Sequence, residues 1–232
     1  MTSFIDSELG EIIVHKRRGT RSVRIKLGTD GRLVATAPFY TPLLFIKQVV
    51  ITSRGELKKL LEPANQPRLY IDRQTIGKHH TLRIVPTSMV KKPTTKIERH
   101  TLLVYVPPTA QLEDQAVQQQ IRDTAITILR REAKAYLPGM LQQLAESYGF
   151  SYERVRFSHA SGRWGSCSST GTISLNIALM KLPDELIHYV LIHELAHTRE
   201  MNHSKNFWAI VERYDPHFRV HKRQLKRETP SV

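Results

Sequence analysis

The sequence predicts an α+β fold, in which an N-terminal strand-rich region precedes a mainly helical second half. Over the first hundred residues, short apolar segments rich in β-branched side chains alternate with polar residues, as strands do. After Pro107-Pro108 the apolar residues recur at helical spacing over a much longer stretch. We therefore expect a strand-rich region at residues 1–108 and a second domain at residues 109–232.

Several strands and one helical segment are expected in the first region. The strands are predicted at 11–15, 22–27, 32–37, 81–85 and 101–106. Asp30-Gly31 stands between the second and third of these, and this dipeptide favours a tight hairpin. Helical spacing covers 41–61, as one helix or two short ones, while the proline- and lysine-containing segment 86–100 is expected to be a mobile loop.

The second domain begins with a long helical pattern at 111–148, which Pro138-Gly139 would divide or kink. Strands are predicted at 155–159 and 172–179, on either side of a Gly- and Ser-rich turn at 161–171. A helix follows from Pro183 into the 190s, and a last basic helix is expected from the 200s towards Arg227.

The chain carries 35 lysines and arginines against 21 aspartates and glutamates, a formal net charge of +14. Such a field attracts polyanions, so a contact with a nucleotide or nucleic acid through the basic surface is one interpretation. A solvated surface without a specific partner is the other. The single cysteine excludes an intramolecular disulfide, and neither a signal peptide nor a long apolar run is evident. We expect a cytoplasmic protein with no membrane contact, and the oligomeric state stays open.

The strongest chemical signal is the segment His193-Glu194-Leu195-Ala196-His197. Residues four apart on a helix lie on one face, so both imidazoles can bind one zinc ion at about 2.0–2.1 Å. Glu194 points about 100° round the helix, where it would lie beside a water on the metal as a general base. Two histidines that happen to be four apart are the alternative. The apolar flanking residues favour a metal site, because buried polar groups need partners.

A catalytic zinc ion usually has three protein ligands and one open position. Glu200, Glu212 and His203 are the candidates for the third ligand. Glu200 lies seven residues after His193, about 10 Å along a helix, which is too far for both to reach one ion. His203 is favoured, because Asn202 tolerates a left-handed turn that would end the helix and bring His203 back to the metal.

Ordered blocks across the second domain resemble the YgjP-like metallopeptidase family, which is related to the SprT-like and WLM zincins. The blocks are RWGSCS at 163–168, ISLN at 173–176, Leu182-Pro183, Tyr189-Val190, HELAH at 193–197 and NHSKNFW at 202–208. Metzincins share the 193/197/203 histidine spacing, but they have glycine in place of Glu200 and a methionine after the third histidine. Neither feature is present here, so we set metzincins aside.

The resemblance implies a zincin-like metallopeptidase domain at 109–232 with an HExxH active-site helix. It implies Zn2+ on His193, His197 and His203, with Glu194 as the base, and it places the block at 163–168 near the metal. In zincins the edge of a strand above the cleft can pair with an extended peptide. Residues 172–177 are our candidate for that edge.

Zinc-dependent hydrolysis of a protein or peptide is therefore the favoured function. Arg163 and Trp164 are candidate substrate-binding residues. Arg163 would clamp an anionic group or stabilise an oxyanion, or else pair with a carboxylate that orients the site. Trp164 also suits packing, and Phe207 and Trp208 are expected to anchor the terminal helix on the core. Cys167 suits a small buried side chain better than a ligand.

Two other functions fit part of the sequence. A basic protein with a metal and Arg163 would also suit hydrolysis of a phosphoanhydride, as in a nucleoside triphosphate pyrophosphatase. A nucleic-acid-associated protein with an inactive or structural zinc site is the second alternative. It would require a closed site with four ligands and binding that weakens steeply with salt.

Overall fold

The computed structural model describes residues 2–28, 31–61, 69–160 and 162–232. The chain forms two compact units, Met1–Leu69 and Tyr70–Val232. Strands and helices are mixed in both units, so the expected α+β class and the strand-rich beginning are confirmed. The expected boundary between residues 108 and 109 falls inside the second unit, and as a functional division it stays a prediction.

The first unit is a four-stranded sheet with two helices on one face. Its strands are β1 (Thr2–Asp6), β2 (Gly10–Arg17), β3 (Arg24–Leu27) and β4 (Leu33–Pro38), in the order β1-β2-β4-β3. Helices α1 (Leu43–Thr52) and α2 (Arg54–Leu61) bury Ile46, Val50 and Leu57 against Ile12 and Leu33. The expected hairpin joins β3 and β4, which pair antiparallel, although Asp30 lies outside the described residues. Strand β1 was not predicted.

The second unit begins with another four-stranded sheet. Strands β5 (Thr75–Ile76), β6 (His80–Pro86), β7 (Thr94–Glu98) and β8 (Thr101–Val106) lie in the order β5-β6-β8-β7. The prediction of a loop at 86–100 is wrong in its second half, where β7 pairs antiparallel with β8. After Pro93 the residues Thr-Thr-Lys-Ile alternate in exposure, and β-branched side chains at this period suit a strand.

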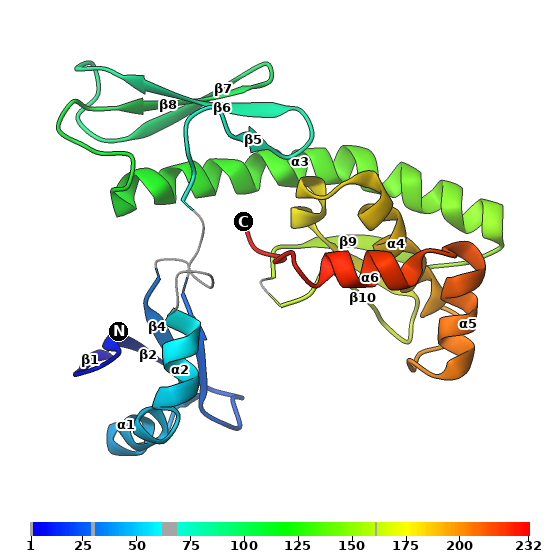
Figure 1. Ribbon diagram of the computed structural model, residues 1–232, viewed down its shortest axis with the longest axis horizontal. Coiled ribbons are helices and arrows are strands. Elements are labelled where there is room, and N and C mark those ends of the chain that lie inside the picture. Colours follow the sequence, from blue (N-terminus) through cyan, green and yellow to red (C-terminus); the bar gives the residue numbers. More distant parts are fainter. Residues whose placement is uncertain (1, 29–30, 62–68, 161) are drawn as a thin grey trace. The chain divides into compact units, whose positions relative to one another are not determined.

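Helix α3 (Gln115–Tyr148) runs beneath this sheet and continues into the core around the site (Figure 1). Its first half packs on the sheet through Val117, Ile121 and Ile128, and its second half packs through Leu137 and Leu141. Pro138-Gly139 was expected to divide or kink the helix, and the division is wrong, because α3 is continuous. A kink at this point stays a prediction. Leu137 and Leu141 are fully buried on either side of the proline, and this packing outweighs the hydrogen bond that Pro138 cannot donate.

The remaining elements build the site. Strands β9 (Arg154–Ser158), β10 (Gly165–Cys167) and β11 (Thr172–Asn176) form a sheet, followed by a 3-10 helix (Ile177–Lys181) and the helices α4 (Asp184–Ala196), α5 (Lys205–Tyr214) and α6 (Phe218–Leu225). The strand predicted to reach Leu179 thus ends at Asn176. The single basic helix predicted at the end is two helices, because Asp215-Pro216-His217 separates α5 from α6.

The candidate peptide-binding edge at 172–177 is also wrong. The sheet order is β10-β11-β9, so β11 is the middle strand and both of its edges are already paired. Strand β10, which lies inside the segment predicted to be a turn, forms an outer edge instead. Among the described residues, no helix has the length and apolar character needed to cross a membrane.

Glu132 of α3 accepts hydrogen bonds from the connection between β5 and β6 and so holds the β5–β8 sheet against the helix. Its carboxylate accepts hydrogen bonds from the backbone N–H of Lys78 (2.7 Å) and of His79 (3.3 Å), and it lies 2.7 Å from Nδ1 of His80. Gly77 approaches so closely that a Cβ there would overlap the same carboxylate. Glu132 and His80 are both buried, so these bonds have no ready replacement by water.

We predict that Glu132→Ala destabilises the second unit by about 2–4 kcal/mol, because it leaves buried donors without an acceptor. Trp164 and Trp208 are the two tryptophans of the chain, so their fluorescence during urea unfolding reports on this unit alone. Glu146→Ala, at an exposed position of the same helix, is the control and should change the free energy of unfolding by less than about 0.5 kcal/mol. Equal losses of stability in the two variants would contradict the role of Glu132 as the acceptor for these buried donors.

Candidate metal centre

Three histidines converge at the carboxyl end of α4. The side chains of His193, His197 and His203 each offer a ring nitrogen, and these nitrogens all lie within 4.8 Å of one another. Nε2 of His193 lies 3.1 Å from Nε2 of His203. Two nitrogens bound tetrahedrally to one zinc ion would lie roughly 3.3 Å apart. The arrangement therefore fits a shared metal ion of that size.

The turn after α4 sets the orientation of the second and third histidines. Helix α4 ends at Ala196, with His197 as its C-cap residue, and Nδ1 of His197 lies 3.2 Å from the backbone oxygen of Glu200. That contact leaves Nε2 of His197 free to face the other two rings. Ser204 caps the next helix by accepting a hydrogen bond from the N–H of Phe207, so α5 begins directly after His203.

The predicted left-handed turn at Asn202 is wrong. Among the described residues, the only non-glycine residues with a positive φ are Arg73 and Arg99. The helix was expected to end near Asn202, but α4 ends at Ala196 and a short turn follows it. Arg199 holds this turn in place by donating hydrogen bonds to the backbone oxygens of Tyr148 and Gly149, at the end of α3.

Phe207 forms a buried floor beneath the three imidazoles. Its ring centroid lies 4.9, 4.5 and 4.8 Å from those of His193, His197 and His203. Trp208 stacks on His203 at 5.6 Å, and Nζ of Lys222 lies 3.8 Å from the centroid of the Trp208 ring. The sequence suggested only that Phe207 and Trp208 anchor the terminal helix. The structure adds that both rings also contact the clustered histidines.

Burial keeps the first two histidines in the form that binds a metal. Burial, together with the neighbouring His197, His203 and Lys222, lowers the pKa of His193 to about 3. Burial also lowers the pKa of His197. Both rings are therefore neutral near pH 7, and a neutral imidazole can donate its lone pair without first losing a proton.

Glu194 lies beside this cluster and is only 4% exposed. Burial raises the pKa of its carboxyl to about 8, and the charge of Arg163 opposes that rise. Among the described residues its Oε2 atom has no hydrogen-bond partner, and neither does Nδ1 of His193. A buried carboxyl of this kind gains from a nearby cation, which favours its charged form. The three ring nitrogens and this carboxyl together fit a divalent metal.

Strand β10 crosses directly over the Glu194 side chain. A Cβ added to Gly165 would lie 2.6 Å from Oε1 of Glu194 and 2.8 Å from its Cδ and Cγ, closer than real Cβ contacts allow. A side chain at this position would therefore displace the carboxylate of Glu194. Gly165, Trp164, Tyr189 and Leu225 line a cavity of about 200 Å³ that reaches His193 and Glu194.

The loop that carries Arg163 and Trp164 is held by Asn176, which is fully buried. The Asn176 side-chain amide donates to the backbone oxygens of Ala160 and Arg163, at 2.6 and 2.9 Å, and also to that of Pro230. Arg163 itself is exposed, and its charge acts on the Glu194 carboxyl. Trp164 lines the cavity and also packs against the core, so both expected roles are consistent with its position.

Other residues weighed as ligands lie outside the cluster. Among the described residues, the group that can hold a metal has three members, His193, His197 and His203. Glu212 is ion-paired with Arg219 at 2.6 Å, and Glu200 contributes only its backbone oxygen. Cys167 donates to the backbone oxygen of Ser168, and burial raises the pKa of its thiol.

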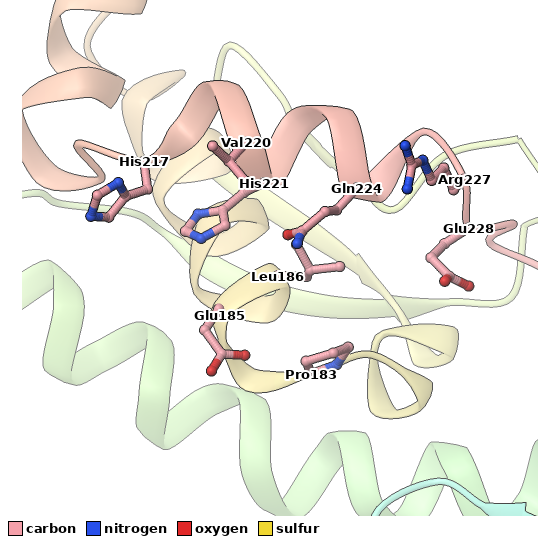
Figure 2. Close-up of a pocket in the computed structure, with 9 residues that line it drawn as sticks. All are labelled: Pro183, Glu185, Leu186, His217, Val220, His221, Gln224, Arg227 and Glu228. Atoms are coloured by element: carbon pink, nitrogen blue, oxygen red, sulfur yellow. The ribbon is translucent and has the colours of Figure 1, made fainter.

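A larger cavity of about 470 Å³ lies between α4 and α6, away from this cluster (Figure 2). Figure 2 shows His221 and Gln224 of α6 facing Glu185 and Leu186 of α4. Nδ1 of His221 lies 2.8 Å from a carboxylate oxygen of the buried Asp215. The cavity contains none of the three clustered histidines and no Glu194, so cavity size alone does not locate the chemistry of this protein.

The class that this fold and site define is a metallopeptidase, and the comparisons with known proteins agree. The model of the YgjP-like metallopeptidase domain matches residues 21–228, and the chain belongs to the YgjP-like family. No curated protein matches the chain.

Two solved structures are similar to part of the chain. The metallopeptidase zymogen abylysin of Pyrococcus abyssi is 29% identical and has a TM-score of 0.35, with 38% of this chain and 91% of that chain covered. The metallopeptidase zymogen jannalysin of Methanocaldococcus jannaschii is 20% identical and also has a TM-score of 0.35, with 38% and 92% covered.

We predict that Gly165→Ala lowers kcat about tenfold to a hundredfold, because the added methyl group displaces the Glu194 carboxylate. Metal content should not change, since the three histidines lie elsewhere. Gly162→Ala is the matched control, because a Cβ there meets no atom within 4 Å. Full activity of Gly165→Ala on the same peptide substrate would show that the position of Glu194 does not limit turnover.

Proposed function

We propose that this protein is a zinc-dependent peptidase in which His193, His197 and His203 hold the ion and Glu194 is the general base. The observation that carries this proposal is the convergence of three ring nitrogens within 4.8 Å beside a buried carboxyl that has an unpartnered oxygen. An all-nitrogen set of three ligands is typical of catalytic zinc, whereas harder cations prefer oxygen ligands.

Each residue of the site then has a defined part in hydrolysis. Zinc, when bound, lowers the pKa of a water ligand towards about 7 and polarises the scissile carbonyl. Glu194 accepts the proton of the attacking water and delivers it to the nitrogen of the leaving amine. Arg163 favours the charged form of Glu194 before that step, since its charge opposes the effect of burial.

Strand β10 is our candidate for the binding edge of an extended peptide. In the antiparallel ladder with β11, the N–H of Asn176 donates to Trp164 and the N–H of Ser168 donates to Thr172. The alternation of such a ladder turns the backbone groups of Gly165 and Cys167 away from β11. A peptide that paired with these groups would pass beside Glu194, and main-chain pairing demands little of its sequence.

The two alternative functions make different demands on the same residues. A structural zinc site needs a fourth ligand, and the metal-binding group among the described residues has three members. A phosphohydrolase would use the same base and the charge of Arg163, so substrate tests must separate it from a peptidase. The backbone edge of β10 favours the peptidase, because an extended peptide can pair with successive backbone groups along a strand, whereas a nucleotide has no backbone of that repeat.

We predict that Glu194→Gln retains one bound zinc ion per chain but lowers peptide hydrolysis about a hundredfold to ten-thousandfold, because the amide cannot accept the proton. His203→Ala is the complementary variant: with two ligands left it should bind zinc much more weakly, so that the ion is lost on dialysis, and it should lose the activity. Zinc content by elemental analysis and turnover of a mixed peptide panel, with and without a chelator, measure the two effects.

The same panel should include nucleoside triphosphates. Chelator-sensitive turnover of nucleotides without any turnover of peptides would replace the peptidase with a phosphohydrolase. Undiminished peptide turnover by Glu194→Gln would remove this glutamate from the mechanism.

A further inference from the structure

The sheet of the first unit has one face that its own helices leave open. Ile12, Val14, Leu33 and Ala35 point towards α1 and α2 and are buried. Since side chains alternate along a strand, the residues between them point to the other face. On that face the register places Arg24 of β3 beside Thr36 of β4 and His15 of β2. Arg17 and Lys26 share this face, so it carries basic side chains on β2 and β3, with Thr36 of β4 between them.

These basic residues form one group, which we call the basic face. It consists of Arg17, Arg24 and Lys26 on the sheet, together with Arg18 and Arg21 in the connection from β2 to β3. All five are exposed, and among the described residues none has a carboxylate within ion-pair distance.

The nearby acidic residues are engaged elsewhere in the unit. Asp6 and Glu8 pair with Arg54, and Glu8 also pairs with Lys58. Glu11 pairs with Arg32 at the opposite end of β2 from Arg17. The acidic side chains thus neutralise basic residues of α2 and Arg32, which lies away from Arg17. The basic face keeps its full charge and is available to a polyanion.

Two exposed aromatic rings stand at the end of β4, next to the basic face. Phe39 and Tyr40 are 60% and 83% exposed, and they follow Pro38, which is paired with Arg17 across the sheet. The guanidinium of Arg18 lies 5.8 Å from the centroid of the Phe39 ring. Exposed apolar side chains that lie together often mark a binding site. Aromatic rings beside arginines form a surface on which unpaired bases stack.

We propose that the basic face and the rings of Phe39 and Tyr40 bind single-stranded nucleic acid. The cations contact the phosphate backbone, and the two rings stack with unpaired bases, which a duplex does not expose. The sheet gives the cations a fixed spacing, and His15 and Thr36 between them offer hydrogen bonds to sugar and base edges. This binding is separate from peptide hydrolysis and involves no residue of the metal centre.

An anionic membrane surface fits these features less well. The exposed apolar residues of α1, Leu44, Phe45 and Ile51, lie on a helix that packs against the opposite face of the sheet. A flat membrane could therefore contact the apolar helix or the basic face, but not both together. Interfacial binding is strongest when apolar and basic side chains meet the same surface.

The test uses the full-length protein and fluorescein-labelled 20-nucleotide single strands of DNA and of RNA, with binding followed by fluorescence anisotropy. The triple variant Arg17→Glu, Arg24→Glu, Lys26→Glu should bind at least about tenfold more weakly, and its dependence of log K on log salt should be shallower by about 2. The double variant Phe39→Ala, Tyr40→Ala should lose about tenfold in affinity while keeping the salt slope of the wild type.

A matched control separates a local site from total charge. The triple variant Lys91→Glu, Lys92→Glu, Lys134→Glu changes the net charge equally through three exposed residues of the second unit, and it should bind as the wild type does. Peptide hydrolysis should be unchanged in all three variants, and an unchanged circular dichroism spectrum of each variant shows that its first unit still folds.

Three results would overturn the proposal. Equal losses in the two triple variants would reduce the effect to net charge. A duplex of equal length that binds as tightly as the single strand, without any effect of the aromatic double variant, would exclude base stacking. Binding to anionic lipid vesicles without binding to either oligonucleotide would assign the basic face to a membrane.

Discussion

The packing of Phe207 against three imidazoles is the contact on which the metal centre depends. His193 and His197 come from one helix, but His203 comes from a turn that the chain could place in many ways. Phe207 fixes that turn, because its ring is fully buried and touches all three histidines, and Ser204 starts its helix directly after His203. The core that buries Phe207 is built from the second half of α3 and from α4, so the geometry of the site is coupled to the stability of this unit.

The site must keep its imidazoles neutral and the Glu194 carboxyl charged, and the different surroundings of these groups allow both. A metal needs neutral imidazoles, and burial lowers the pKa of His193 and His197. A general base needs a charged carboxylate, yet the same burial raises the pKa of Glu194 to about 8. Arg163 opposes that rise from a loop tied down by Asn176, and a divalent ion would oppose it further. The apolar surroundings that favour neutral imidazoles thus make the charged form of Glu194, the proposed base, depend on cations around it.

Much of this arrangement could be predicted from the sequence, because it depends on spacing along single elements. Helix geometry was enough to place His193 and His197 on one face and to exclude Glu200. The choice of His203 relied on a left-handed turn at Asn202, which the structure does not contain. The predictions that proved wrong concern features that depend on contacts between distant segments. Burial of Leu137 and Leu141 keeps α3 continuous through Pro138, and pairing with β8 turns half of a predicted loop into β7. The close approach of Gly165 to Glu194 and the central place of β11 also follow only from the strand order.

X-ray absorption at the zinc edge of the full-length protein, loaded with one equivalent of zinc, identifies the ligands of the ion. We expect three imidazole nitrogens and one oxygen, all at about 2.0–2.1 Å, with one imidazole fewer in His203→Ala and an unchanged set in Glu194→Gln. A sulfur ligand at about 2.3 Å, a fourth protein ligand, or an unchanged spectrum in His203→Ala would contradict a catalytic three-histidine site.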